Sequence, residues 1–262
     1  MNAPCRPQIK TPLRPVPASR PREERGQIAR PSPVEQGSAD FGIKGFLETS
    51  FLDWPGRLAA VIFLGGCNFR CPFCHNAELV LSPHLVPAIA LDSILRRLRE
   101  LRGWVDGVVV SGGEPTLSPR LPELLGRVRA EGFDVKLDTN GSCPDVLARL
   151  TARGLVQAFD MDIKAPLEPA LYAALAGVPV RLELIRASID LIRFSGLPHR
   201  FRTTYVPGLL DHPAIARLRA AIPVGSSHLL QGFNPQRVLD PSLRSVAAPT
   251  AEELLLLGGS AA

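Results

Sequence analysis

Apolar residues follow two alternating patterns along the chain from about Phe41 onward. Short runs rich in apolar and β-branched residues predict strands at 43–48, 58–64, 107–111, 133–138, 156–163, 201–206 and 227–232. Between them, apolar residues recur at helical spacing, in the sets Leu91, Ile94, Leu95, Leu98, Leu101; Leu121, Leu124, Leu125, Val128; and Leu184, Ala187, Ile189, Ile192. Strands that alternate with amphipathic helices predict an α/β fold with a parallel sheet, and these helical residues are interpreted as the layer that covers it.

Chemically unusual residues follow six of these strands, at the point where each strand ends. They are Gly65-Gly66-Cys67, Gly112-Gly113-Glu114-Pro115, Thr139-Asn140-Gly141, Asp162-Ile163-Lys164, Pro207-Gly208 and Phe233-Asn234-Pro235. Loops after parallel strands form the active edge of such folds, so these residues are predicted to lie together. At roughly 35 residues per βα unit, about 220 residues form six units rather than the eight of a full barrel. The sequence therefore predicts a partial (β/α)6 open barrel.

Charge and proline content separate residues 1–38 from the remainder. These 38 residues hold eight of the 26 prolines and seven basic against three acidic side chains, a net charge of +4, whereas residues 39–262 have a net charge of +1. The tail lacks apolar periodicity and is predicted to be disordered, with one domain at 39–262. The domain has no basic excess for a nucleic-acid partner. The longest apolar run, Leu58 to Leu64, is too short to cross a membrane.

Three of the five cysteines, Cys67, Cys71 and Cys74, lie within eight residues. Thiols this close converge on one point, which is typical of a metal site in a reducing, cytoplasmic compartment rather than of a secreted disulfide framework. Thiolates select zinc or iron–sulfur clusters, and three ligands on a four-iron cluster leave one iron open to a small molecule. The alternative is a structural zinc site completed by His75 or Cys143. Cys5 lies in the tail and is interpreted as incidental.

The Cys-x3-Cys-x-aromatic-Cys motif resembles that of the radical S-adenosylmethionine enzymes. The longer run DWPGRLAAVIFLGGCNFRCPFCHN, from Asp53 to Asn76, resembles the activating proteins of anaerobic ribonucleoside-triphosphate reductases, a branch of the glycyl-radical-enzyme activases. The resemblance covers roughly residues 41 to 235, and SGGEPTL, LDTNG, DMDIK, TTYVPG and QGFNP follow in the expected order. Related deazaguanine-forming enzymes usually carry Asp after the third cysteine. His75 at this position favours the activases.

The resemblance implies a [4Fe-4S] cluster held by Cys67, Cys71 and Cys74, and S-adenosylmethionine beside it. Gly112 and Gly113 would let the backbone approach this cofactor, and the outward-facing carboxylate of Glu114 would accept hydrogen bonds from its amino group. The resemblance also implies that Phe73 packs near the adenine of the cofactor. The residues that it assigns to the ribose and carboxylate of the cofactor are Asp138, Thr139, Asn140, Asp162 and Lys164. Phe73 as a plain core residue and an Asp162–Lys164 ion pair with a purely structural role are the alternatives.

By the same resemblance, the protein is an enzyme that cleaves S-adenosylmethionine reductively and generates a glycyl radical on a partner enzyme. Anaerobic ribonucleoside-triphosphate reductase is the expected partner, with flavodoxin or ferredoxin as the kind of electron donor. Three alternatives remain open: activation of pyruvate formate-lyase or another glycyl-radical enzyme, radical chemistry on a small molecule of the deazaguanine type, and a zinc-binding interaction module.

Overall fold

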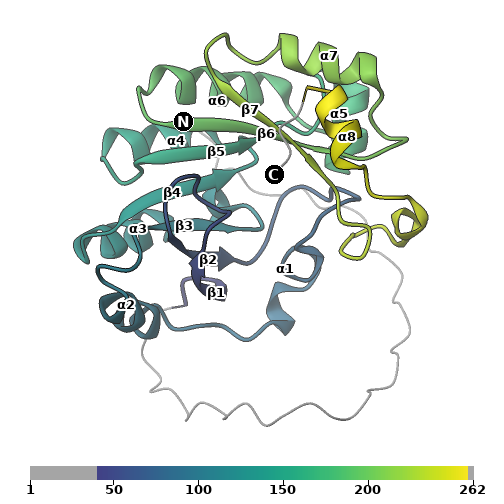
Figure 1. The fold of residues 1–262 in the computed structure, drawn as a ribbon. Coiled ribbons are helices and arrows are strands. Elements are labelled where there is room, and N and C mark those ends of the chain that lie inside the picture. Colours follow the sequence, from purple (N-terminus) through teal and green to yellow (C-terminus); the bar gives the residue numbers. More distant parts are fainter. Residues whose placement is uncertain (1–39, 259–262) are drawn as a thin grey trace, which may run out of the picture. The chain divides into compact units, whose positions relative to one another are not determined.

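The computed structural model describes residues 40–258, and the predicted disorder of residues 1–38, like Cys5, lies outside the described residues. Seven strands form one sheet in the order of the sequence (Figure 1). They are β1 (Ile43–Ser50), β2 (Ala59–Leu64), β3 (Gly107–Gly112), β4 (Asp134–Thr139), β5 (Ala158–Asp162), β6 (His199–Tyr205) and β7 (Ser227–Gly232). All seven predicted strands are confirmed to within two residues at each end. The sheet is open, because β1 and β7 are its two edges.

The six strands from β2 to β7 run parallel, as predicted, but β1 pairs antiparallel with β2. A uniform series of βα units was therefore wrong for the first strand. Only residues 51–58 connect β1 to β2, and this connection is too short for the crossover that a parallel pair requires.

Helices lie outside the curved sheet (Figure 1). The main ones are α2 (Leu91–Glu100), α3 (Leu121–Ala130), α4 (Pro144–Ala152), α5 (Pro169–Ala176), α6 (Leu182–Phe194) and α7 (His212–Ala220). Shorter elements are α1 (Ala77–Leu81), η1 (Pro83–Leu85), η2 (Pro115–Leu117), η3 (Pro241–Ser245) and α8 (Ala251–Leu256). None of the helices described is long and apolar enough to cross a membrane. In α6, Leu182, Ile185, Ile189 and Ile192 form the buried face, so the predicted inclusion of Leu184 and Ala187 was wrong.

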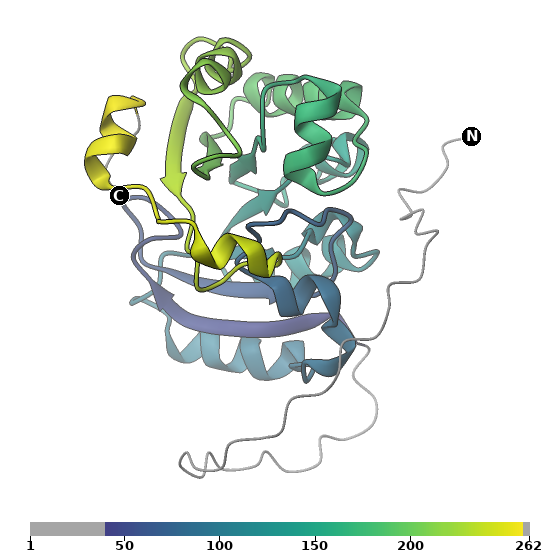
Figure 2. The ribbon, with the colours of Figure 1, turned by 90° about the vertical axis from the view of Figure 1, so that its right-hand side faces the viewer.

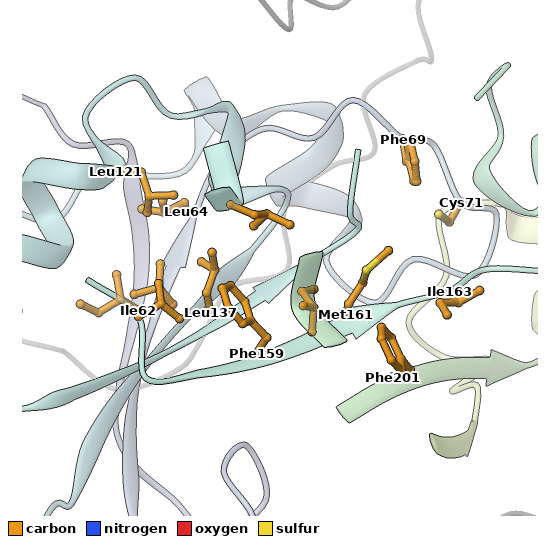
Figure 3. Packing of buried hydrophobic residues seen from close by; sticks show 14 of the residues in the cluster. Ile62, Leu64, Phe69, Cys71, Leu121, Leu137, Phe159, Met161, Ile163 and Phe201 are labelled. Carbon is orange, nitrogen blue, oxygen red and sulfur yellow. The ribbon is translucent and has the colours of Figure 1, made fainter. Parts of the chain in front are cut away.

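Alternate residues of each strand divide the sheet into two faces. Ile62 on β2, Leu137 on β4, Phe159 on β5 and Phe201 on β6 face the helices and form the main core, together with helix residues such as Leu121 (Figure 3). On the opposite, inner face, a small apolar cluster contains Val61 of β2, Val109 of β3 and Ala158 of β5. Charged residues of β4, β5 and β6 lie on the same face. The inner face of the barrel is therefore available for chemistry.

Candidate active site

The three motif cysteines lie on the loop that follows β2, at the carboxyl edge of the sheet. Cys67, Cys71 and Cys74 line one open cavity of about 330 Å³ together with residues from the ends of β3 to β7. Every predicted site residue except Glu114 lines this cavity; the set is Cys67, Cys71, Phe73, Cys74, Gly112, Gly113, Asp138, Thr139, Asn140, Asp162 and Lys164. The strand ends therefore bring these residues together as the sequence predicted. Phe73 also belongs to the helix-side core and is 3% exposed.

The cysteine loop is held by backbone contacts on both sides. The guanidinium of Arg70 donates to the carbonyl oxygens of Cys67 and Phe69, both at 2.7 Å. The backbone N–H of Arg70 donates to the carbonyl of Ala176, at the end of α5. Gly177 follows with a φ of +69°, and a Cβ there would lie 2.0 Å from the Arg70 carbonyl oxygen. The tight approach of α5 thus fixes the loop from behind.

Burial raises the pKa of the Cys67 thiol to about 12 and that of Cys71 to about 11, and it also raises the pKa of Cys74. These thiols remain protonated at neutral pH until a metal replaces the proton, so metal binding releases protons. Among residues 40–258, no three His, Cys, Asp or Glu side chains are close enough to hold a single metal ion. The three cysteines line one cavity and supply the kind of thiolate donors that an iron–sulfur cluster requires.

Gly112, the last residue of β3, packs against Leu64 of β2, and Gly113 packs against the cysteine loop. Gly113 donates from its N–H to Leu64, and the N–H of Glu114 donates to the carbonyl of Gly66 at 2.8 Å. A Cβ on Gly113 would lie 1.9 Å from the Gly66 carbonyl oxygen. Gly113 is therefore required for the contact between the β3 loop and the cysteine loop. The two glycines also leave backbone atoms exposed to the cavity.

Glu114 does not face outward, so that part of the prediction was wrong. Its side chain is buried, 2% exposed, and points into the protein. Oε1 accepts hydrogen bonds from the N–H and hydroxyl of Thr116 and from the hydroxyl of Thr139, while Oε2 accepts from the N–H of Asn140 at 2.6 Å. Burial raises the pKa of this carboxyl, although these hydrogen bonds oppose the rise. Glu114 joins the loops after β3 and β4, because the carboxylate meets more donors inside the protein than at the cavity.

A charged pair, Asp162 and Lys164, lines the far side of the cavity. Their side chains lie on the same face as predicted, with Lys164 Nζ 2.9 Å from Asp162 Oδ2. Arg202 on β6 donates from Nε to Asp162 Oδ1 at 2.8 Å. Burial alone would raise the pKa of Asp162, but the charges of Arg202 and Lys164 outweigh it and hold the pKa below its usual range. Asp162 is therefore an ionised acceptor beside the cysteines.

Four charged residues deeper in the barrel were not predicted from the sequence: Lys136, Asp160, Arg200 and Arg202. Lys136 lies between Asp138 and Asp160, and Arg202 reaches both carboxylates from β6. Arg200 also contacts Asp160, at 2.5 Å. The signal was present as charges at every second position of KLD, DMDIK and RFR, which places them on one face of each strand.

The segment that follows β7 meets the cysteine loop across the open edge of the barrel. His75 Nε2 accepts a hydrogen bond from the N–H of Asn234 at 3.0 Å. The N–H of Asp240 donates to the carbonyl of Pro72 at 2.8 Å. Figure 2 shows the chain leaving β7, in yellow-green, and crossing toward the blue segment that follows β2. These two contacts join the first and last parallel strands at the cysteine edge.

The part of the chain that forms this site is similar to a known protein family. A profile of the radical SAM superfamily matches residues 61–233, which contain every residue that lines the cavity except Asp53. The chain belongs to the radical SAM superfamily. Radical SAM proteins use a [4Fe-4S] cluster and S-adenosylmethionine.

Among radical SAM relatives, the chain is 29% identical over 220 residues to MJ1227 of Methanocaldococcus jannaschii, whose name proposes it as a glycyl-radical enzyme activating enzyme. This match covers 82% of the chain and 90% of that protein. Shorter matches are with 7-carboxy-7-deazaguanine synthase of Neisseria meningitidis, at 35% over 34% of the chain, and pyruvate formate-lyase-activating enzyme of Staphylococcus aureus, at 32% over 35% of the chain. They span 39% and 38% of those proteins.

The fold is also similar to that of a solved structure, TYW1 with a lysine-pyruvate adduct bound. The TM-score is 0.54 at 18% identity, with 76% of this chain and 71% of that chain covered. At this identity the similarity concerns the fold alone. It supports the open α/β barrel that the strand and helix pattern predicted.

Proposed function

We propose that this radical SAM protein is an activase that generates a glycyl radical on a partner enzyme. The observation that carries the proposal is one open cavity lined by the three motif cysteines and by the Asp162–Lys164 pair. When bound, the [4Fe-4S] cluster and S-adenosylmethionine would supply one electron and a 5′-deoxyadenosyl radical that removes a hydrogen atom from the substrate.

The chain's own residues would bind and orient these cofactors. Cys67, Cys71 and Cys74 would each hold one iron and leave the fourth open. Lys164 supplies a positive charge suited to a carboxylate, and the ionised Asp162 supplies acceptors suited to hydroxyl groups of the ribose.

The remaining cavity residues would shape the cofactor site. Gly112 and Gly113 leave room for the cofactor against the backbone. Asp138 and Thr139 offer further polar groups, and Phe73 offers an apolar ring for the adenine. Glu114 would act by holding the loop that carries Thr139, since it has no surface on the cavity.

Two observations favour a macromolecular partner. The match with MJ1227 extends along nearly the whole of that protein, whereas the match with the deazaguanine enzyme is limited to about a third of the chain. The barrel edge between β1 and β7 is open, which suits a substrate loop of another protein. Anaerobic ribonucleoside-triphosphate reductase is the proposed partner, and pyruvate formate-lyase or another glycyl-radical enzyme is the second candidate. A cytoplasmic flavodoxin or ferredoxin would deliver the electron.

Anaerobic reconstitution tests the proposal in two steps. First, the full chain is expected to bind four irons and four sulfides and to form 5′-deoxyadenosine from S-adenosylmethionine when dithionite is added. Second, incubation with each candidate partner should give the doublet signal of a glycyl radical in electron paramagnetic resonance. Cofactor cleavage without a doublet on any glycyl-radical enzyme, but with turnover of a purine or pterin precursor, would favour the small-molecule alternative. Absence of both a cluster and cleavage would reject the radical function.

A further inference from the structure

The side chain of Asn140 lies between the loop after β4 and the cysteine loop, and it is buried, 6% exposed. Its Oδ1 accepts a hydrogen bond from the N–H of Ser142 at 2.9 Å. Its Nδ2 lies 2.9 Å from Oδ1 of Asn68 and 3.9 Å from Sγ of Cys67. An amide nitrogen carries two hydrogens, so Asn140 has one for each of these acceptors.

Neighbouring hydrogen bonds fix the orientation of this amide. Asn68 donates from its own Nδ2 to the hydroxyl of Ser142 at 2.9 Å, so its Oδ1 is the atom that faces Asn140. A flipped Asn140 would place oxygen against that oxygen and would turn its NH2 toward the N–H of Ser142. Glu114 also holds the Asn140 backbone through the 2.6 Å bond to its N–H. The NH2 group is therefore directed at the Cys67 sulfur by contacts that do not depend on it.

Cys67 already has one donor at its sulfur, because the N–H of Phe69 lies 3.3 Å from Sγ. We propose that Asn140 is a second donor to this sulfur and that it raises the reduction potential of the cluster bound there. This inference rests on the proposed function, since it requires that Cys67 ligates the cluster. It gives Asn140 a different role from the contact with S-adenosylmethionine that the sequence suggested.

The direction of the effect follows from charge. The reduced cluster carries one more negative charge than the oxidised cluster, and part of that charge resides on the thiolate sulfurs. A hydrogen bond to a sulfur stabilises the more electron-rich state, and such bonds are among the features that set cluster potentials. The bond is partly buried, which limits competition from water for the donor. Asn140 therefore acts as a positioning and tuning residue that makes the cluster easier to reduce.

The test is a redox titration of the reconstituted full chain, followed by electron paramagnetic resonance in the absence of S-adenosylmethionine. Asn140→Ala is expected to lower the reduced-to-oxidised ratio at the wild-type midpoint by about three- to tenfold. For a one-electron couple this equals a shift of about 28 to 59 mV toward more negative potential. Asn140→Leu keeps about the same side-chain size without the donor and without adding a charge, so it should shift the potential in the same direction even if Asn140→Ala fails to fold.

Ser188→Ala is the matched control. The Ser188 hydroxyl donates to the carbonyl of Gly141 at 2.7 Å, so this change removes a buried hydrogen bond from the same loop and leaves the donor to sulfur in place. Its potential should equal that of the wild type. A normal cluster with unchanged potential in both Asn140 variants, or an equal shift in Ser188→Ala, would overturn the inference and leave the proposed function standing. Failure of the wild-type chain to bind a cluster would reject both.

Discussion

The amino group of Lys136 lies 2.7 Å from Oδ2 of Asp160, inside the barrel, where neither side chain is more than 3% exposed. The same amino group contacts Oδ1 of Asp138 at 2.5 Å. Burial alone would raise the pKa of Asp138, but the positive charges of Arg202 and Lys136 outweigh it and lower the pKa. One lysine therefore compensates two carboxylates on neighbouring strands, directly below the cavity.

Replacing Lys136 by Met should destabilise the protein strongly, because it removes the buried amino group that contacts both carboxylates and leaves only Arg200 and Arg202 as their counter-charges. Breaking a buried ion pair in this way lowers the free energy of unfolding by about 3 to 5 kcal/mol. Urea denaturation of the full chain measures the change. Arg217→Met is the control, since the Arg217–Glu168 pair is about half exposed on both sides and should contribute far less to stability. Equal effects of the two changes would show that the buried network adds nothing to stability.

Local patterns in the sequence predicted the strands and most of the cavity, because each strand and the loop after it are encoded within a few residues. The buried network was missed because it depends on register between strands. Asp138 pairs with Asp160, and Asp162 with Arg202, only once β4, β5 and β6 are aligned. The orientation of Glu114 depends in the same way on donors that come from the β4 loop, 25 and 26 residues further along the chain.

Glu114→Ala should lower stability before it affects cofactor binding. The change leaves the buried hydroxyl of Thr139 and the N–H of Asn140 without their acceptor, which costs about 1 to 3 kcal/mol for each unsatisfied group. Urea denaturation without cofactors should show this loss. Glu123→Ala removes an exposed carboxylate paired with Arg120 and serves as the control, with a much smaller change in stability. Normal stability combined with weakened S-adenosylmethionine binding in calorimetric titration would instead support direct contact between Glu114 and the cofactor.

Gly113→Ala should disrupt the junction between the β3 loop and the cysteine loop. Its methyl group would collide with the carbonyl of Gly66, a backbone atom that can move only if the loop carrying Cys67 moves. We expect a loss of more than about 2 kcal/mol in stability and a lowered iron content after reconstitution. Gly126→Ala in α3 is the control, since its nearest neighbour is 4.0 Å away and alanine favours helix by about 1 kcal/mol. A Gly113→Ala protein with full iron content would contradict the tight junction.

Changing any one of Cys67, Cys71 or Cys74 to Ala should abolish cluster assembly and cofactor cleavage, because two thiolates cannot hold a cluster with one open iron. Cys143→Ala should retain both, since Cys143 precedes α4 and is absent from the residues that line the cavity. Iron and sulfide assays with absorption spectra after anaerobic reconstitution give the answer. Cluster loss in Cys143→Ala together with retention in Cys74→Ala would reverse the ligand assignment.

The half-buried ring of His228 on β7 should make stability depend on pH. Thr203 donates its hydroxyl hydrogen to the Ile163 carbonyl, so His228 Nε2 donates to Thr203, and the buried Nδ1 has no hydrogen-bond partner among residues 40–258. Burial and the charge of Arg219 lower the pKa of His228 to about 4. The usual pKa of an unfolded histidine is about 6.5. Between this pH and about pH 4, His228 binds a proton in the unfolded chain but not in the folded chain, so the free energy of unfolding falls as pH falls.

Urea midpoints at pH 7 and pH 5 should therefore differ more in the wild type than in His228→Gln, although partial exposure of the ring screens the effect. Identical pH dependence in the two proteins would mean that His228 accepts a proton in the folded state as readily as in the unfolded chain.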